Sequence, residues 1–135
     1  MGDRAQVHFV DTGVWLYTHW DAYELIETVQ RALARKLRWT DTEYLARIVF
    51  CEMCKGDYDG EMGYGIGRGQ HSDVYRVVEI NCKEAEVAVV RGFPDSIIEE
   101  MKTAGIDHDF EKKHDVWRGP ISDFIEAELT FHPDG

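Results

Sequence analysis

The sequence lacks any apolar run near the roughly 20 residues that a membrane-spanning helix needs. Its first residues, Met1 to Gln6, are polar and lack the apolar core of a secretory signal peptide. Gln6 also stands where a myristoylation signal has Ser or Thr. These absences predict a cytoplasmic protein that does not enter a membrane.

Cysteine is scarce, with three in 135 residues, and an odd number without a disulfide framework suits a reducing compartment. Cys51 and Cys54 form a C-x-x-C pair inside an expected helix, and Cys82 follows in an expected strand. Structural zinc usually takes four ligands, and nothing in the sequence fixes which histidine would complete the set. A redox pair would stand at a helix N-terminus, whereas this pair falls near a C-terminal end. We therefore expect core or near-core thiols and predict no metal and no cofactor.

Basic residues are few: 15 Lys and Arg stand against 26 Asp and Glu, which gives a net charge of −11. Such an excess makes direct binding to nucleic acid unlikely. The acidic excess indicates either a plain soluble surface or binding to a partner that is itself basic, such as a protein that normally binds nucleic acid. The length fits a single domain of residues 1–135, long enough to bury one core.

The segment from Val14 to Met53 predicts one strand followed by two helices. Residues 14–20 are rich in aromatic and β-branched side chains, which favours a strand. Alternation places Leu16 and Thr18 on one face and Trp15, Tyr17 and His19 on the other. Because both faces are bulky, we expect both to be covered.

Asp21, with Glu24 three residues later, is typical of a helix start. The helix that follows has one apolar stripe, formed by Leu25, Ile26, Val29, Leu33 and Leu37. A second helix is predicted by the capping-box pattern of residues 40–43, and Gly56 is a natural stop for it.

The other elements are read from alternation and from turn residues. Strands are expected at 5–10, 74–82 and 86–90, and a short helix at 93–105. Residues 63–69 alternate glycine with larger side chains, which predicts either a mobile loop or a strand whose glycine face is closely packed. The tail, 106–135, is expected to be a C-terminal extension that docks through Trp117 and a weak helical stripe after Ile121.

Together these elements predict an α+β two-layer sandwich. Its sheet is antiparallel or mixed, has about five strands and carries a helix pair on one face, in the order β-β-α-α-β-β-β-α. A homodimer is possible.

Two places could carry chemistry or recognition. The junction from Tyr17 to Glu24 joins a histidine to two carboxylates, so it could bind a metal or supply a general base, or its acids could simply cap the helix. Its aromatic residues also suit a recognition patch. The glycine run at 63–69 does not have the dinucleotide-binding spacing, but it could let a ligand approach its backbone. The candidate binding residues are Tyr17, His19, Trp20, Asp21, Tyr23, Tyr64 and Arg68, and no catalytic residue is assigned.

Two weaker patterns favour plain structure over metal binding. Asp57 to Glu61 begins like a calcium loop, but the ligand spacing fails after Gly60, so an acidic turn is expected. The pairs His108-Asp109 and His114-Asp115 are more typical of a solvated, charged face.

The opening of the chain resembles a loose group of small uncharacterised prokaryotic and phage proteins, in which a strand pair ends in Tyr-x-His-Trp-Asp. The matching residues here are Arg4 to Val7 and Leu16 to Asp21. The resemblance covers the first third of the chain and implies no activity. It does imply a phage or mobile-element origin, where small acidic inhibitors of host proteins are frequent.

Two main functional hypotheses follow, and a structural zinc protein is a third, weaker one. The first is an acidic interaction protein, such as a phage or mobile-element inhibitor that binds a basic, nucleic-acid-binding site on a host protein. The alternative is a small-ligand-binding protein or hydrolytic enzyme that uses the Tyr17–Glu24 junction and the Gly63–Gly69 segment.

Overall fold

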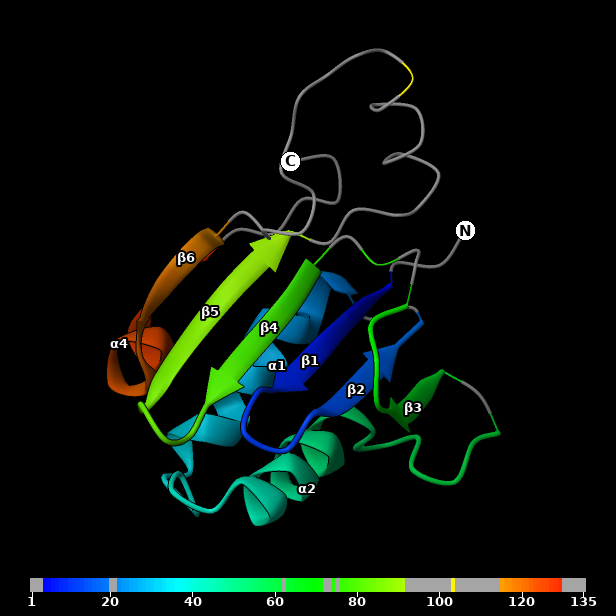
Figure 1. Ribbon diagram of the computed structural model, residues 1–135. Coiled ribbons are helices and arrows are strands. Elements are labelled where there is room, and N and C mark those ends of the chain that lie inside the picture. The colour runs from blue at the N-terminus through cyan, green and yellow to red at the C-terminus, as the bar shows by residue number, and fades with distance from the viewer. Residues whose placement is uncertain are drawn as a thin grey trace.

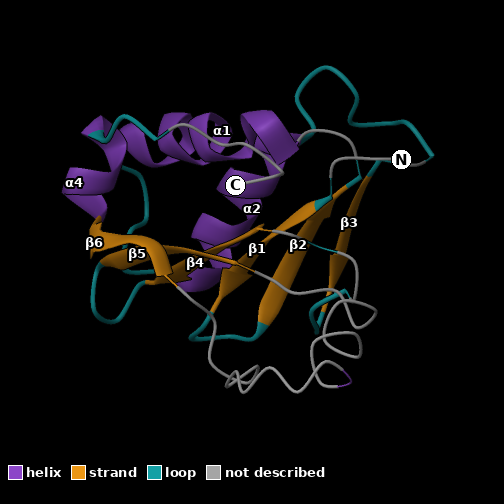
Figure 2. Ribbon diagram, turned by 90° about the horizontal axis from the view of Figure 1, so that it is seen from above, coloured by secondary structure: helices purple, strands orange, loops and turns teal. Residues whose placement is uncertain are grey.

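The computed structural model describes residues 4–19, 22–61, 63–71, 74, 76–91, 103 and 115–129. The described helices and strands, in chain order, are β1 (Ala5–Phe9), β2 (Val14–Thr18), α1 (Ala22–Ala34), α2 (Thr42–Met53), β3 (Tyr64–Gly67), β4 (Arg76–Asn81), β5 (Glu86–Arg91), β6 (Asp115–Pro120) and α4 (Ile121–Glu126). The strands form one open sheet in the order β3-β2-β1-β4-β5-β6 (Figure 1). The helices lie on one face of this sheet (Figure 2). The α+β prediction is confirmed, with six strands where about five were expected.

The sheet is mixed because β1 pairs with β4 in parallel while its other neighbour, β2, is antiparallel. The β1–β2 hairpin turns at Gly13, which has a φ of 70° that glycine adopts without steric cost. The Asp11 carboxylate in this turn accepts the N–H groups of Cys82 (2.8 Å) and Lys83 (3.2 Å). It therefore ties the first hairpin to the turn between β4 and β5.

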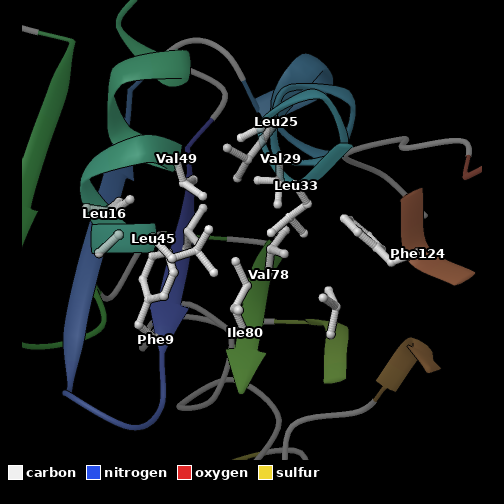
Figure 3. Close-up of a cluster of buried hydrophobic side chains, with 14 of the residues drawn as sticks. Phe9, Leu16, Leu25, Val29, Leu33, Leu45, Val49, Val78, Ile80 and Phe124 are labelled. Atoms are coloured by element: carbon white, nitrogen blue, oxygen red, sulfur yellow. The ribbon is translucent and has the colours of Figure 1, made fainter. Parts of the chain in front are cut away.

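The main core lies between the sheet and the helices (Figure 3). Cross-strand register aligns Leu16, Val7, Val78 and Val89 in one helix-facing row. Onto this row pack the apolar side chains of α1 and α2, which include Leu25, Val29, Leu33, Leu45 and Val49. Each such side chain contributes about 1.5–3 kcal/mol when it is fully buried, so this interface is the principal stabilising feature of the fold.

The opposite face of the sheet carries a second, smaller buried cluster. Its members are Trp15, Val74, Val77, Ala88 and Val90, with Tyr17 packed against them. Trp15 is 8 % exposed and its neighbour Leu16 is 1 % exposed. The expectation that both faces of β2 are covered is therefore confirmed.

The connection between α1 and α2 differs from the sequence prediction. The helix α1 ends at Ala34, so Leu37 leaves the apolar stripe and is 41 % exposed. Lys36 and Arg38 have positive φ angles, which end the helical path. The Trp39 indole N–H donates to the Leu33 carbonyl at 3.0 Å, and Trp39 packs against the core in place of Leu37. The N-cap of α2 is Asp41, without a side-chain cap hydrogen bond, so the capping box is not formed.

The tail docks, as expected, but it begins with a strand that the sequence did not predict. Strand β6 pairs with β5, and its Trp117 ring meets the Phe124 ring of α4 at a centroid distance of 5.5 Å. Phe124 is fully buried in the main core. The helix expected at 93–105 and the His108-Asp109 and His114 positions lie outside the described residues, apart from residue 103.

Within the described ranges, every helix is too short or too polar to cross a lipid bilayer.

Candidate functional site at the β2–β3 edge

The predicted site residues divide between the two faces of the sheet. Tyr17 and His19 lie together on the face away from the helices, at the end of β2. Tyr64 lies on the helix side, where it packs against the main core, and Arg68 is exposed just after β3. Trp20 and Asp21 lie outside the described residues, and only the backbone of Tyr23 is described, within α1. The structure therefore brings Tyr17 and His19 together but separates them from Tyr64.

Four side chains form what we call the imidazole cluster: Arg4, Tyr17, His19 and His71. The Nδ1 atom of His19 lies 3.2 Å from Arg4 Nε and 3.3 Å from the Tyr17 hydroxyl oxygen. Arginine Nε can only donate, so Nδ1 of His19 accepts and the ring proton is on Nε2. His71 stacks on Tyr17 with ring centroids 4.3 Å apart.

Gln6 holds the loop after β3 against this cluster. Gln6 is 1 % exposed. Its side-chain amide nitrogen donates to the Gly69 carbonyl at 3.1 Å, and its amide oxygen accepts the backbone N–H of His71 at 2.9 Å. Sequence reasoning missed Arg4, Gln6 and His71 as partners of Tyr17 and His19. His71 is more than 50 residues from either, and no local pattern signals such a contact.

A second stack lies further along the same face. The His8 and Trp15 rings are 3.9 Å apart and almost parallel, at 9°. His8 Nδ1 is 3.7 Å from a Glu79 carboxylate oxygen and has no hydrogen-bond partner within the described residues. This distance permits an ion pair when His8 is protonated but is too long for a hydrogen bond.

The expectation of close packing against the glycines of β3 is wrong. A Cβ atom built on Gly65 or Gly67 would meet no atom within 4 Å. These glycines lie opposite Tyr17 and Trp15 in the register, so they leave open space beside the two rings. Between them Ile66 is 66 % exposed, although it lies opposite buried Leu16.

The strand β3 is the edge of the described sheet and has no charged residue (Figure 1). The backbone N–H of His19 donates to the Gly63 carbonyl at 2.8 Å, so His19 and Gly63 are a hydrogen-bonded pair of the β2–β3 ladder. Hydrogen-bonded and non-hydrogen-bonded pairs alternate along an antiparallel ladder. The amide and carbonyl of Ile66 therefore point away from β2, outward from the sheet.

The loop before β3 is acidic and exposed. It carries Asp57, Asp59 and Glu61. A Cβ on Gly60 would lie 2.5 Å from an Asp57 carboxylate oxygen, so the Asp57 side chain folds back over the glycine. This compact geometry agrees with the acidic turn expected from the sequence.

On the helix side, a depression of about 360 Å³ opens between α1, the end of α2 and β3. We call it the charged groove; it is lined by Glu24, Thr28, Arg31, Glu52, Met53, Lys55 and Tyr64. Arg31 pairs with Glu52 at 3.2 Å, and Lys55 lies 3.9 Å from the other Glu52 oxygen. Of the predicted site residues, the groove includes Tyr64 but neither His19 nor Arg68.

The cysteines are all free thiols: Cys51 is exposed, Cys54 is half-buried and Cys82 is buried. Burial raises the pKa of the Cys54 thiol, and the neighbouring Cys51 raises it further. Burial also raises the pKa of Cys82. Raised pKa values disfavour the thiolate that metal binding requires. Across the described part of the chain, no three His, Cys, Asp or Glu side chains converge on a possible metal position.

No protein-family model, curated protein or solved structure matches this chain.

Proposed function

We propose that this chain is a small acidic interaction protein that binds an extended, positively charged segment of another protein by adding it as a strand to the outer edge of β3. The single observation that carries the proposal is that the outer edge of β3 is exposed and uncharged. Ile66 is 66 % exposed in a strand without charge, with open space at Gly65 and Gly67 on the opposite face.

Sheet edges are normally protected, because an exposed row of amide and carbonyl groups pairs readily with another chain. Charged side chains, proline, bulges and a short edge strand are the usual protection. Strand β3 is short, with four residues, but it has no charge, proline or bulge, and the outward backbone groups of Ile66 have the geometry that strand addition requires. This edge is therefore consistent with binding of a short extended segment.

The charge near this edge favours a basic partner. Asp57, Asp59 and Glu61 precede β3, and Arg68 is the nearest basic residue after it. The whole chain carries −11, so it attracts positively charged partners at long range and accelerates their association at low salt.

The partner class extends the resemblance to phage and mobile-element proteins: a host protein with a basic, nucleic-acid-binding segment would suit this edge. More than half of the net charge belongs to residues outside the described ranges. For this reason the proposal rests on β3 and its acidic loop and does not invoke a nucleic-acid-like array of charge.

The proposal is tested by selecting peptides from a random phage-displayed library against the whole protein. We expect enriched peptides with alternating β-branched residues and at least two Lys or Arg. Their binding should weaken as salt rises and fall at least tenfold with Ile66→Pro, which removes the outward N–H. An edge strand tolerates proline better than a central strand does.

The matched control replaces another exposed apolar residue, Leu37, which is 41 % exposed and far from β3 in the sequence. Ile66→Lys should abolish binding to the selected basic peptides, whereas Leu37→Lys should leave it within twofold of the unchanged protein. Peptides that bind equally to all these variants, or that lack basic residues, would refute strand addition at β3.

A further inference from the structure

The charged groove combines charges of both signs over a partly apolar floor. Glu24, Thr28 and Arg31 follow one another at spacings of four and three along α1, so they share one face of the helix. Met53 is 6 % exposed and Thr28 is 7 % exposed at its base. A smaller recess of about 10 Å³ shares Thr28, Met53 and Tyr64 with the groove and is also lined by Thr18 and Leu25. The groove is thus a shaped depression that reaches the margin of the core.

The ion pairs in the groove leave donors available at one end. Arginine has five N–H donors, and the recorded bonds of Arg31 use one on Glu52 and one on the Thr28 hydroxyl (3.2 Å). Lys55 is 77 % exposed in its side chain, and its contact with Glu52 is long, at 3.9 Å. Glu52 is 12 % exposed in its side chain and orients both cations. Because Glu52 bridges the two cations, an anionic group would bind them through their remaining donors, beside the Glu52 carboxylate.

The other end of the groove is negative. Glu24 lies seven residues before Arg31, which corresponds to about 10 Å along a helix. Glu24 is exposed, and Tyr64 lines the same groove. A carboxylate and an aromatic ring in one groove are suited to an ammonium group.

From this arrangement we propose that the charged groove binds a zwitterion of about dipeptide length. Its ammonium lies at Glu24 and Tyr64, and its carboxylate accepts the remaining donors of Arg31 and Lys55, beside Glu52. A free α-amino acid has its charges on one carbon and is too short to reach both ends. The site goes beyond strand addition, because it lies on the helix side of β3 and uses neither Ile66 nor the outer edge.

The test is a titration of the ¹⁵N-labelled whole protein, followed by NMR, with glycylglycine as the probe. N-acetylglycylglycine lacks the ammonium, glycylglycinamide lacks the carboxylate, and glycine is the short control. We expect saturable shifts at the amides of Thr28, Met53 and Tyr64 with glycylglycine alone. Each of the other three compounds should bind at least tenfold more weakly.

Two variants assign the ends of the groove. Glu24→Gln should weaken glycylglycine binding at least tenfold, and so should Lys55→Gln. Glu27→Gln, on the same helix but outside the groove, is the matched control and should bind like the unchanged protein. Amide spectra of the variants without ligand report whether each is folded, and all three positions are exposed.

Shifts that grow linearly without saturation up to roughly 20 mM would overturn the site, since that behaviour means no specific affinity. Equal binding of the blocked compounds, or binding that Glu24→Gln leaves unchanged, would also overturn it. Ile66→Pro should not alter glycylglycine binding, so this result and the peptide selection succeed or fail separately.

Discussion

Two glycines of the sheet have opposite surroundings, although both stand in short edge strands. A Cβ on Gly119 in β6 would lie 2.9 Å from the Trp117 ring, which folds over it. A Cβ on Gly67 in β3 would meet nothing within 4 Å. The first glycine is needed for close packing, and the second leaves the surface open.

Gly119→Ala should therefore destabilise the protein by about 1–3 kcal/mol, because the new methyl group must displace the Trp117 ring from its contact with Phe124. Gly67→Ala is the matched control and should change stability by less than about 0.5 kcal/mol. Urea unfolding followed by tryptophan fluorescence measures both. Equal destabilisation by the two substitutions would mean that the Trp117 contact does not matter.

At the residue scale, the sequence could predict only contacts that are close along the chain. Tyr17 and His19 were correctly placed on the same face by alternation, since they are two residues apart in one strand. Tyr64 was grouped with them, but register pairs it with Thr18, on the helix side. Arg4 and His71 join the imidazole cluster, and Gln6 holds the loop beside it, through the paths of separate segments, which alternation and local spacing cannot reveal.

At the scale of elements, hydrophobic periodicity located both long helices and four of the six described strands, and the glycine alternation left β3 open between a strand and a mobile loop. Strand β6, DVWRGP, was not predicted, because it contains glycine and proline and has only two apolar residues, too few for an alternating pattern. Its conformation depends on pairing with β5 and on a single tryptophan that reaches the core. The C-terminal end of α1 was placed too late because Leu37 continues the apolar spacing. Trp39 competes for the same region of the core, and its indole bond to Leu33 favours the turn.

One side chain of α1 forms hydrogen bonds with the end of helix α4, which also packs into the main core through Phe124. The Gln30 amide nitrogen donates to the carbonyls of Phe124 (2.9 Å) and Ala127 (2.8 Å), where α4 ends. The last carbonyls of an α-helix lack their usual partners four residues on. The Phe124 carbonyl accepts the Ala127 backbone N–H at 3.2 Å, and Gln30 supplies it with a second donor and supplies one to Ala127.

Gln30→Glu keeps the shape but replaces the donor with a carboxylate that faces two carbonyls. We expect a loss of about 2 kcal/mol in the free energy of unfolding, from two hydrogen bonds and an unfavourable charge at a helix C-terminus. Hydrogen exchange should show faster opening of α4 and β6 than of β1 and β2. Glu126→Gln, an exposed change in α4 itself, serves as the control. Unchanged exchange in α4 would contradict the anchoring role of Gln30.

For the whole molecule, the parallel pairing of β1 with β4 makes the sheet mixed and leaves β3 and β6 as its two edges. The sequence left this choice open, because hairpin signals specify antiparallel neighbours but not how two hairpins meet. Burial of the main core follows from the pairing, and so does burial of Cys82, which stands directly after β4. The ionisation of the thiols is therefore coupled to folding as a whole.

The pKa values of Cys54 and Cys82 are raised from their ordinary value of 9.0, in both cases mainly by burial. The folded state thus binds these protons more tightly than the unfolded state does. Their contribution to stability is fully present below pH 9.0 and is lost as pH rises through the folded-state values.

We expect the urea midpoint to fall between pH 8 and about pH 10.5, and we expect part of that fall to come from the two thiols. Tyrosine and lysine also titrate in this range, so the informative quantity is the difference from Cys54→Ala/Cys82→Ala. The double variant starts less stable, because it loses buried side-chain volume, but its midpoint should fall less over the same interval. A parallel fall in both proteins would show that thiol ionisation is not linked to folding.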